Sequence, residues 1–137
     1  MVILYKIDEG IGVLFPATKC GLTIEEIALK DAPEGALTKI IKDSELPDLD
    51  FIDAWESDDK LTEVTINLDK AKETTKVRLR LQRKALLEAQ DILFIQAQET
   101  GSDTTAIVAE KQRLRDITKN ADSCKTTDEL KALSVTE

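Results

Sequence analysis

The chain has 137 residues, a formal net charge of −8 and no histidine. Without histidine, His-dependent catalytic triads and His-ligated zinc sites are excluded. The acidic balance argues against nucleic acid as a partner, because binding to nucleic acid depends on neutralising phosphates. The composition, 42% apolar and 34% charged, is that of a globular protein with one domain or two small subdomains.

The first half predicts a small α+β unit in the order ββαβ. A capping box is present at Thr23-Ile24-Glu25-Glu26, so we expect a short helix from there to about residue 31. A turn is expected earlier in the chain, over residues 8–12. Three segments indicate strands of a sheet: 2–7, 13–15 and 36–42.

The acidic segment 48–60 contains two aromatic residues one helical turn apart, Phe51 and Trp55. We expect a short helical turn, capped by Asp50, that turns both rings inward and leaves the acids in water. Trp55 is also a candidate contact for a partner protein, because Trp is enriched at binding hot spots, although we favour a half-buried place in the core. The spacing of the acids does not fit a calcium-binding EF-hand loop. Residues 61–68 then alternate apolar and polar residues, which predicts a strand or an extended connector.

The second half predicts an αα-hairpin followed by a short third helix. Gly101 is expected to end the first helix, and Asp103 is a candidate N-cap for the second, which we expect to reach Thr118. Thr126 is expected to cap the last helix. Because residues 76–81 also alternate with period two, a strand stays open there as an alternative. A helix over 76–100 places these apolar residues on one stripe: Leu79, Leu86, Ala89, Leu93 and Ala97.

The charges divide the chain near residue 70. Residues 1–69 hold 6 basic and 16 acidic residues, net −10, whereas residues 70–137 hold 13 and 11, net +2. We therefore expect two subdomains with these boundaries. The run Lys70–Lys84 contains seven cations and one acid. Cations at the start of a helix oppose its dipole, so the run needs a counterpart.

Three counterparts of the basic run stay open. The first is the chain's own acidic segment, residues 43–59, and the second is the acidic surface of a partner protein. The third is nucleic acid, although no aromatic residue stands between the cations to stack on bases.

The sequence indicates no catalytic residues, no cofactor motif and no metal site, so we expect a protein that is not an enzyme. Cys20 and Cys124 belong to no CxxC pair and are expected to be free thiols. The N-terminus has neither the basic region nor the long apolar region of a signal peptide, and no apolar segment is long enough to cross a bilayer. We therefore expect an intracellular or particle-associated protein.

Several segments together resemble a known family. Lys30–Glu56, KDAPEGALTKIIKDSELPDLDFIDAWE, resembles a module common in tailed-bacteriophage gene products. VRLRLQRKALLEAQD, KQRLRDIT and TTDELKAL, which start at Val77, Lys111 and Thr126, resemble the helical region of phage tail assembly chaperones and tail-fibre-assembly-like proteins. The matching positions are Arg80, Arg83, Leu86, Leu87 and Asp91, then Gln112, Leu114, Arg115, Asp116 and Ile117.

The resemblance covers roughly residues 28–134 and departs from the family pattern at Ile92, where an aromatic residue commonly follows the Asp. It implies a non-enzymatic phage or prophage protein that assists tail or tail-fibre assembly by binding a partner protein. Such a protein would lie in the cytoplasm of the bacterial host or associate with the virion. A minor structural component of the tail, and a small enzyme or enzyme regulator, are the alternatives, and self-association stays open. The candidate partner-binding residues are Arg78, Arg80, Arg83, Leu86, Leu87, Leu93 and Trp55.

Overall fold

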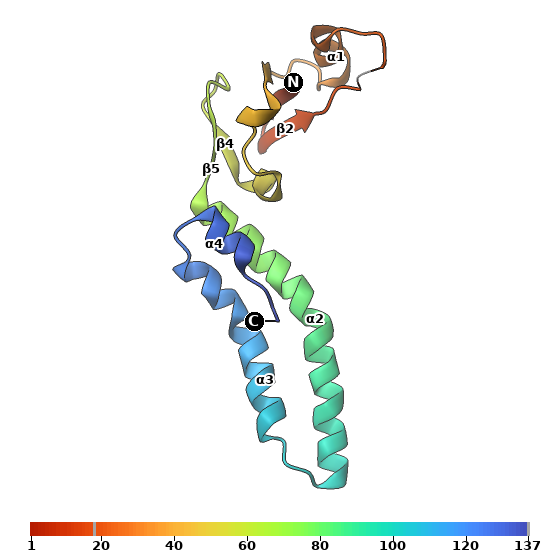
Figure 1. Ribbon diagram of the computed structural model, residues 1–137, viewed down its shortest axis with the longest axis vertical. Helices are drawn as coiled ribbons and strands as arrows, with labels where there is room; N and C mark the ends of the chain where they lie inside the picture. The colour runs from red at the N-terminus through yellow and green to blue at the C-terminus, as the bar shows by residue number, and fades with distance from the viewer. Residues whose placement is uncertain (18, 137) are drawn as a thin grey trace. The chain divides into compact units, whose positions relative to one another are not determined.

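A computed structural model describes residues 1–17 and 19–136 (Figure 1). These residues form two compact units, one up to Lys70 and one from Ala71 onward. Both sheets belong to the first unit, and the second unit is helical. The predicted α+β class is therefore confirmed.

The larger sheet has three antiparallel strands in the order β2-β1-β3. The strands are β1 (Val2–Ile7), β2 (Gly10–Leu14) and β3 (Thr38–Ile41). Helix α1 (Ile24–Asp31) packs its buried residues Ile27 and Ala28 against Ile3 of the central strand. The predicted capping box is present: the Thr23 hydroxyl accepts from the Glu26 amide at 3.2 Å, and the Glu26 carboxylate accepts from the Thr23 amide at 2.7 Å. The ββαβ order is thus confirmed.

Strand β2 begins at Gly10, inside the segment that the sequence analysis assigned to a turn. The physical reason lies across the sheet, where Tyr5 on β1 is paired in register with Gly12. The Tyr5 ring occupies the position that a Cβ on Gly12 would take, so the glycine makes room for an aromatic side chain. A glycine that signals a turn in the sequence is here a packing position within a strand.

A second sheet was not predicted. It pairs β4 (Trp55–Ser57) with β5 (Val64–Ile66), and the 3-10 helix η2 (Leu49–Ala54) precedes it. The expected helical turn therefore ends one residue before Trp55. Its cap is Asp48, whose side chain accepts from the Asp50 amide at 3.0 Å, so the prediction that Asp50 caps the turn is wrong. Burial of Trp55 and Phe51 is confirmed.

The second face of the three-stranded sheet contributes to the core around Trp55. In this cluster Leu4 and Ile11 from β1 and β2 pack with Trp55 and Leu61. Leu61 is fully buried and has a φ of +53°, which no other non-glycine residue among those described shares. A Leu side chain is held there against a backbone preference because the core surrounds it.

Helix α2 (Leu68–Thr100) begins two residues before the basic run, which was expected to open this helix, and it excludes the alternative strand over 76–81. Asn67 caps it, with its side-chain oxygen accepting from the Lys70 amide at 3.0 Å. Asp69 lies in the first turn, where the helix dipole favours an acid. The arginines of the basic run lie more than two turns further along, so the expected conflict with the dipole is confined to Lys70, which pairs with Glu56, and to Lys72.

The second unit continues with α3 (Thr105–Asp116), the 3-10 helix η3 (Ile117–Ser123) and α4 (Thr127–Ala132). Helices α2 and α3 run side by side as the predicted hairpin (Figure 1). Gly101, with a φ of +67°, ends α2, and the Thr126 side chain accepts from the Glu129 amide at 3.2 Å at the start of α4. None of the helices in the described part of the chain combines the length and apolar character that crossing a membrane requires.

The buried side chains of the second unit come from the first third of α2, the end of α3 and the segment that follows it. They are Ala71, Thr75, Leu79, Leu114, Ile117, Ala121, Cys124, Leu130 and Val135.

Candidate partner-binding surface

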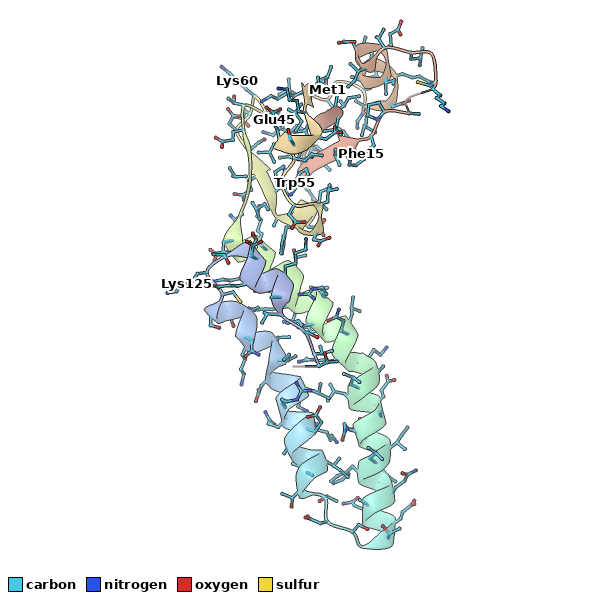
Figure 2. All side chains as sticks on the ribbon, viewed as in Figure 1. Met1, Phe15, Glu45, Trp55, Lys60 and Lys125 are labelled. Atoms are coloured by element: carbon cyan, nitrogen blue, oxygen red, sulfur yellow. The ribbon has the colours of Figure 1, made fainter. Side chains whose placement is uncertain are left out.

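The distal part of the α2–α3 hairpin has no core of its own. We call residues 80–113 the hairpin arm; all of them are described, and none of them is buried. Figure 2 shows side chains projecting outward along this part of the hairpin. The arm exposes six large apolar side chains: Leu81, Leu86, Ile92, Leu93, Ile95 and Val108. Exposed apolar residues gathered on one element are typical of a surface that another molecule covers.

Polar contacts of Lys111 join the two helices of the arm. Its ammonium lies 2.6 Å from the Asp91 carboxylate and 5.0 Å from the centre of the Phe94 ring. An exposed ion pair contributes at most about 1 kcal/mol and a cation–π contact a similar amount. These two contacts of Lys111 therefore contribute little to holding the arm together.

The predicted leucines Leu86 and Leu93 are available for contact with another protein. They are 37% and 46% exposed and lie seven residues apart, so they point in nearly the same direction from α2. Ala89 lies between them, and we call these three residues the arm flank. Leu87 is half-buried and lies to one side of it.

Two of the three predicted arginines have partners within the second unit. Arg78 donates to the Leu130 carbonyl at 3.0 Å. Arg83 donates to the carbonyls of Leu114 and Arg115 at 3.1 and 2.7 Å. The carbonyls of Leu114 and Arg115 lie in the last turn of α3. Carbonyl groups there have no hydrogen-bond donor within the helix, and a cation stabilises them. Arg78 thus joins α2 to α4, and Arg83 joins α2 to α3. Neither contact was predicted from the sequence.

Arg80 differs from its neighbours. It is exposed, and no hydrogen bond or ion pair engages its side chain within residues 1–17 and 19–136. Of the three predicted arginines, Arg80 has the guanidinium that can meet an acidic partner without breaking an internal contact.

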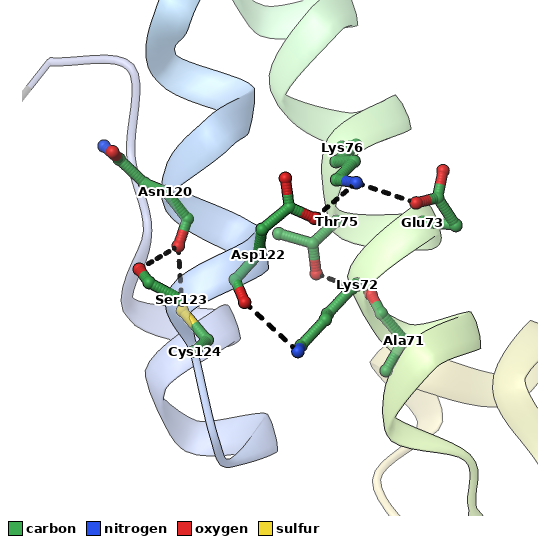
Figure 3. A network of polar contacts seen from close by, with 9 residues as sticks. All are labelled: Ala71, Lys72, Glu73, Thr75, Lys76, Asn120, Asp122, Ser123 and Cys124. Atoms are coloured by element: carbon green, nitrogen blue, oxygen red, sulfur yellow. Dashed lines mark hydrogen bonds and ion pairs between the residues drawn. The ribbon is translucent and has the colours of Figure 1, made fainter.

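Lysines of the basic run also bind groups of the second unit (Figure 3). Lys76 lies 2.6 Å from the Asp122 carboxylate and 2.8 Å from that of Glu73. The pKa of Lys76 is raised, mainly by its hydrogen bond to Asp122 and to a lesser extent by its hydrogen bond to Glu73. Lys72 donates to the Asp122 main-chain carbonyl at 3.2 Å. The network ties the third turn of α2 to η3.

At the beginning of the run, Lys70 pairs with an acid of segment 43–59. Its ammonium lies 2.6 Å from the Glu56 carboxylate. Hydrogen bonds from Lys70 and Asn67 lower the pKa of Glu56. The intramolecular interpretation therefore holds for Lys70, whereas Lys72, Lys76, Arg78 and Arg83 bind groups outside the acidic segment.

Trp55 is a core residue, as the favoured interpretation of the sequence had it, and it is buried more completely than expected. It is 3% exposed, and its indole N–H donates to the Asp48 carbonyl at 3.1 Å (Figure 2). With ring and N–H both engaged, it offers no surface to a partner. The candidate role of Trp55 in partner binding is corrected accordingly.

Neither cysteine is in a disulfide, as expected. Cys20 is exposed and Cys124 is buried, and burial is the main cause that raises the pKa of the Cys124 thiol. Across the described ranges no group of three Cys, Asp or Glu side chains is placed to hold a metal ion.

Sequence reasoning missed the apolar residues Val77 and Ile95, which are exposed on the side of α2 away from the predicted stripe. The sequence did contain a signal, because the side of an amphipathic helix that faces water is expected to carry polar residues and these two are apolar. Comparison of the chain with protein-family models, with curated proteins and with solved structures finds no match.

Proposed function

We propose that this protein is a non-enzymatic binding protein that assists the assembly of a phage tail or tail fibre, with the hairpin arm as its binding element. The observation that carries the proposal is the arm itself, which has no buried residue and exposes Leu86 and Leu93 on the arm flank. The resemblance of the two arm helices to phage tail assembly chaperones supplies the class of partner.

The energetics of the arm favour a bound state. Fully burying a Leu or Ile side chain contributes about 1.5–3 kcal/mol relative to leaving it exposed. Leu86 and Leu93 are each between a third and a half exposed, so covering them offers roughly 1 kcal/mol apiece. A partner with an apolar groove would gain this energy along the arm flank, in the manner of a helix bound in a groove.

The charge of Arg80 suggests the chemistry at the rim of that groove. An acidic group of the partner placed near Arg80 would speed the encounter and define the orientation. The partner we propose therefore has an apolar groove with an acidic edge, as an unassembled tail or tail-fibre protein can expose before its own subunits cover it.

Co-purification with defined tail and tail-fibre proteins of the encoding phage or prophage tests the proposal. The variant Leu86→Glu/Leu93→Glu changes the arm flank, and we expect it to lose capture of the partner. Leu29→Glu, at an 87% exposed position of α1, is the matched control and should retain it. Circular dichroism of each variant checks that the helices are intact. Equal capture by both variants would contradict the role of the arm.

Mass spectrometry of mature particles separates assembly factor from structural component. An assembly factor binds its partner and is then absent from the finished particle. Recovery in stoichiometric amount would replace the proposal by the alternative, a minor structural component of the tail.

A further inference from the structure

The outer side of α2, opposite the buried Leu79, carries six exposed residues that we call the outer seam. Four of them are apolar and two are charged: Val77, Leu81, Lys84, Glu88, Ile92 and Ile95. At about 100° per residue they fall within an arc of roughly 80°. The apolar members are between 52% and 71% exposed, which is more than either leucine of the arm flank. The outer seam is thus a continuous surface distinct from the arm flank.

The order of residue types along the outer seam is nearly symmetric about position 86. Val77 and Ile95 lie nine residues before and after it, and Lys84 and Glu88 lie two before and two after it. Leu81 lies five residues before it, and Ile92 six after. When a second α2 is laid antiparallel across this midpoint, apolar residues oppose apolar residues. In the same arrangement Lys84 opposes Glu88 of the other copy, and the twofold axis makes that contact twice.

We propose that the outer seam binds the outer seam of a second copy of this chain, with the two α2 helices antiparallel. The charge distribution along the helix selects this occupant and this direction. Of the five cations in residues 76–84, Lys76, Arg78 and Arg83 bind groups of the second unit, which leaves Arg80 and Lys84. Of the three acids in residues 85–100, Asp91 binds Lys111, which leaves Glu88 and Glu99. An antiparallel pair places the basic half of each helix against the acidic half of the other, and a parallel pair would oppose like charges.

Lys84 and Glu88 are free to make this contact. Both are exposed, and neither takes part in a hydrogen bond or an ion pair with the rest of the described chain. Their neighbours are engaged, since Arg83 binds carbonyls of α3 and Asp91 binds Lys111. The two charges at the centre of the outer seam are therefore those that a second copy can use.

The size of the surface sets the strength of the pairing. From Val77 to Ile95 the helix rises about 27 Å, at 1.5 Å per residue, and a helix is about 10 Å wide. This footprint is smaller than the roughly 800 Å² per partner of a standard interface. The dimer is accordingly expected to be weak and transient. The inference does not depend on the proposed function, because it concerns a different side of α2 and is tested on the purified chain alone.

Sedimentation velocity of the purified protein from about 1 to 500 μM tests the proposal by charge reversal. We expect a monomer at the lowest concentrations and a dimer at the highest. Lys84→Glu or Glu88→Lys alone opposes like charges across the pair, and each should weaken self-association about tenfold or more. Lys30→Glu on α1 changes the net charge as Lys84→Glu does, and it should leave the dimer unchanged.

Complementation is the sharper test. Lys84→Glu and Glu88→Lys chains, each monomeric alone, should associate when mixed, because every reversed charge then meets its opposite. The double variant Lys84→Glu/Glu88→Lys should regain dimerisation as well. Three results would each overturn the proposal. The wild-type chain could stay monomeric over the whole concentration range, or the single charge reversals could weaken self-association no more than Lys30→Glu does. The third is that the two singly reversed chains do not associate when mixed.

Discussion

Replacing Leu4 by Ala should destabilise the first unit strongly. Leu4 is 1% exposed on the central strand, in contact with the cluster of Ile11, Trp55 and Leu61. The substitution removes three carbon atoms, which at about 0.8 kcal/mol each gives about 2.4 kcal/mol of lost transfer free energy. The cavity that remains between two packed sheets adds roughly 1–2 kcal/mol, so we expect a loss of about 3–4 kcal/mol. A unit of this size has a free energy of unfolding of about 3.5–10 kcal/mol, so the variant lies near the limit of folding.

The chain offers both the probe and the control for this measurement. Trp55 is the single tryptophan and belongs to the same cluster, so its fluorescence reports urea unfolding of the first unit. With a slope of about 1 kcal/mol per molar urea, Leu4→Ala should lower the midpoint by about 3–4 M. Leu29→Ala removes the same atoms at an 87% exposed position of α1 and should shift it by less than about 0.5 M. Equal shifts for the two variants would refute the assignment of the core.

Three further predictions concern positions with a defined local constraint. Gly12→Ala places a methyl group against the Tyr5 ring and should lower the free energy of unfolding by about 1–3 kcal/mol. Gly10→Ala, where the added methyl group meets open space, should lower it by less than about 0.5 kcal/mol. Equal urea midpoints for the two variants would argue against the close approach of Tyr5 and Gly12. At Leu61, where φ is +53°, the Gly variant should be at least as stable as the Ala variant, reversing their usual order, and a clearly more stable Ala variant would contradict this backbone conformation. Ellman's reagent should modify the exposed Cys20 at once and Cys124 only when the second unit opens, because Cys124 is buried and burial raises its pKa. Simultaneous reaction of both thiols in the native protein would contradict the burial of Cys124.

Local patterns predicted the elements whose hydrogen bonds close within a few residues. The capping box at Thr23 and the cap at Thr126 are formed as expected, and Gly101 ends the long helix. Each feature depends on groups at most three or four residues apart, so its energetics can be read from neighbouring letters. The hairpin followed for the same reason, since a short link between two amphipathic helices makes them antiparallel neighbours.

The candidate surface was predicted in part. Leu86 and Leu93 lie exposed on α2, as a contact surface requires, whereas Trp55 is in the core. Arg78 and Arg83 bind carbonyl groups 52 and 31 residues away in the chain. No rule of spacing relates positions so distant, so their internal partners could not be inferred from the sequence.

The α+β class, the helix caps and the separation of charge near residue 70 are properties of the sequence alone, because they depend on composition and short-range periodicity. The second sheet and the hairpin arm without a core emerge only from the folded chain. Long-range packing assigns each apolar side chain either to a core or to water, and residues of the same type can have opposite outcomes. Leu79 and Leu81 are two residues apart in one helix, yet Leu79 is fully buried and Leu81 is 71% exposed. A helix turns about 200° between them, and only the position of α3 and the C-terminal segment defines which side is inside.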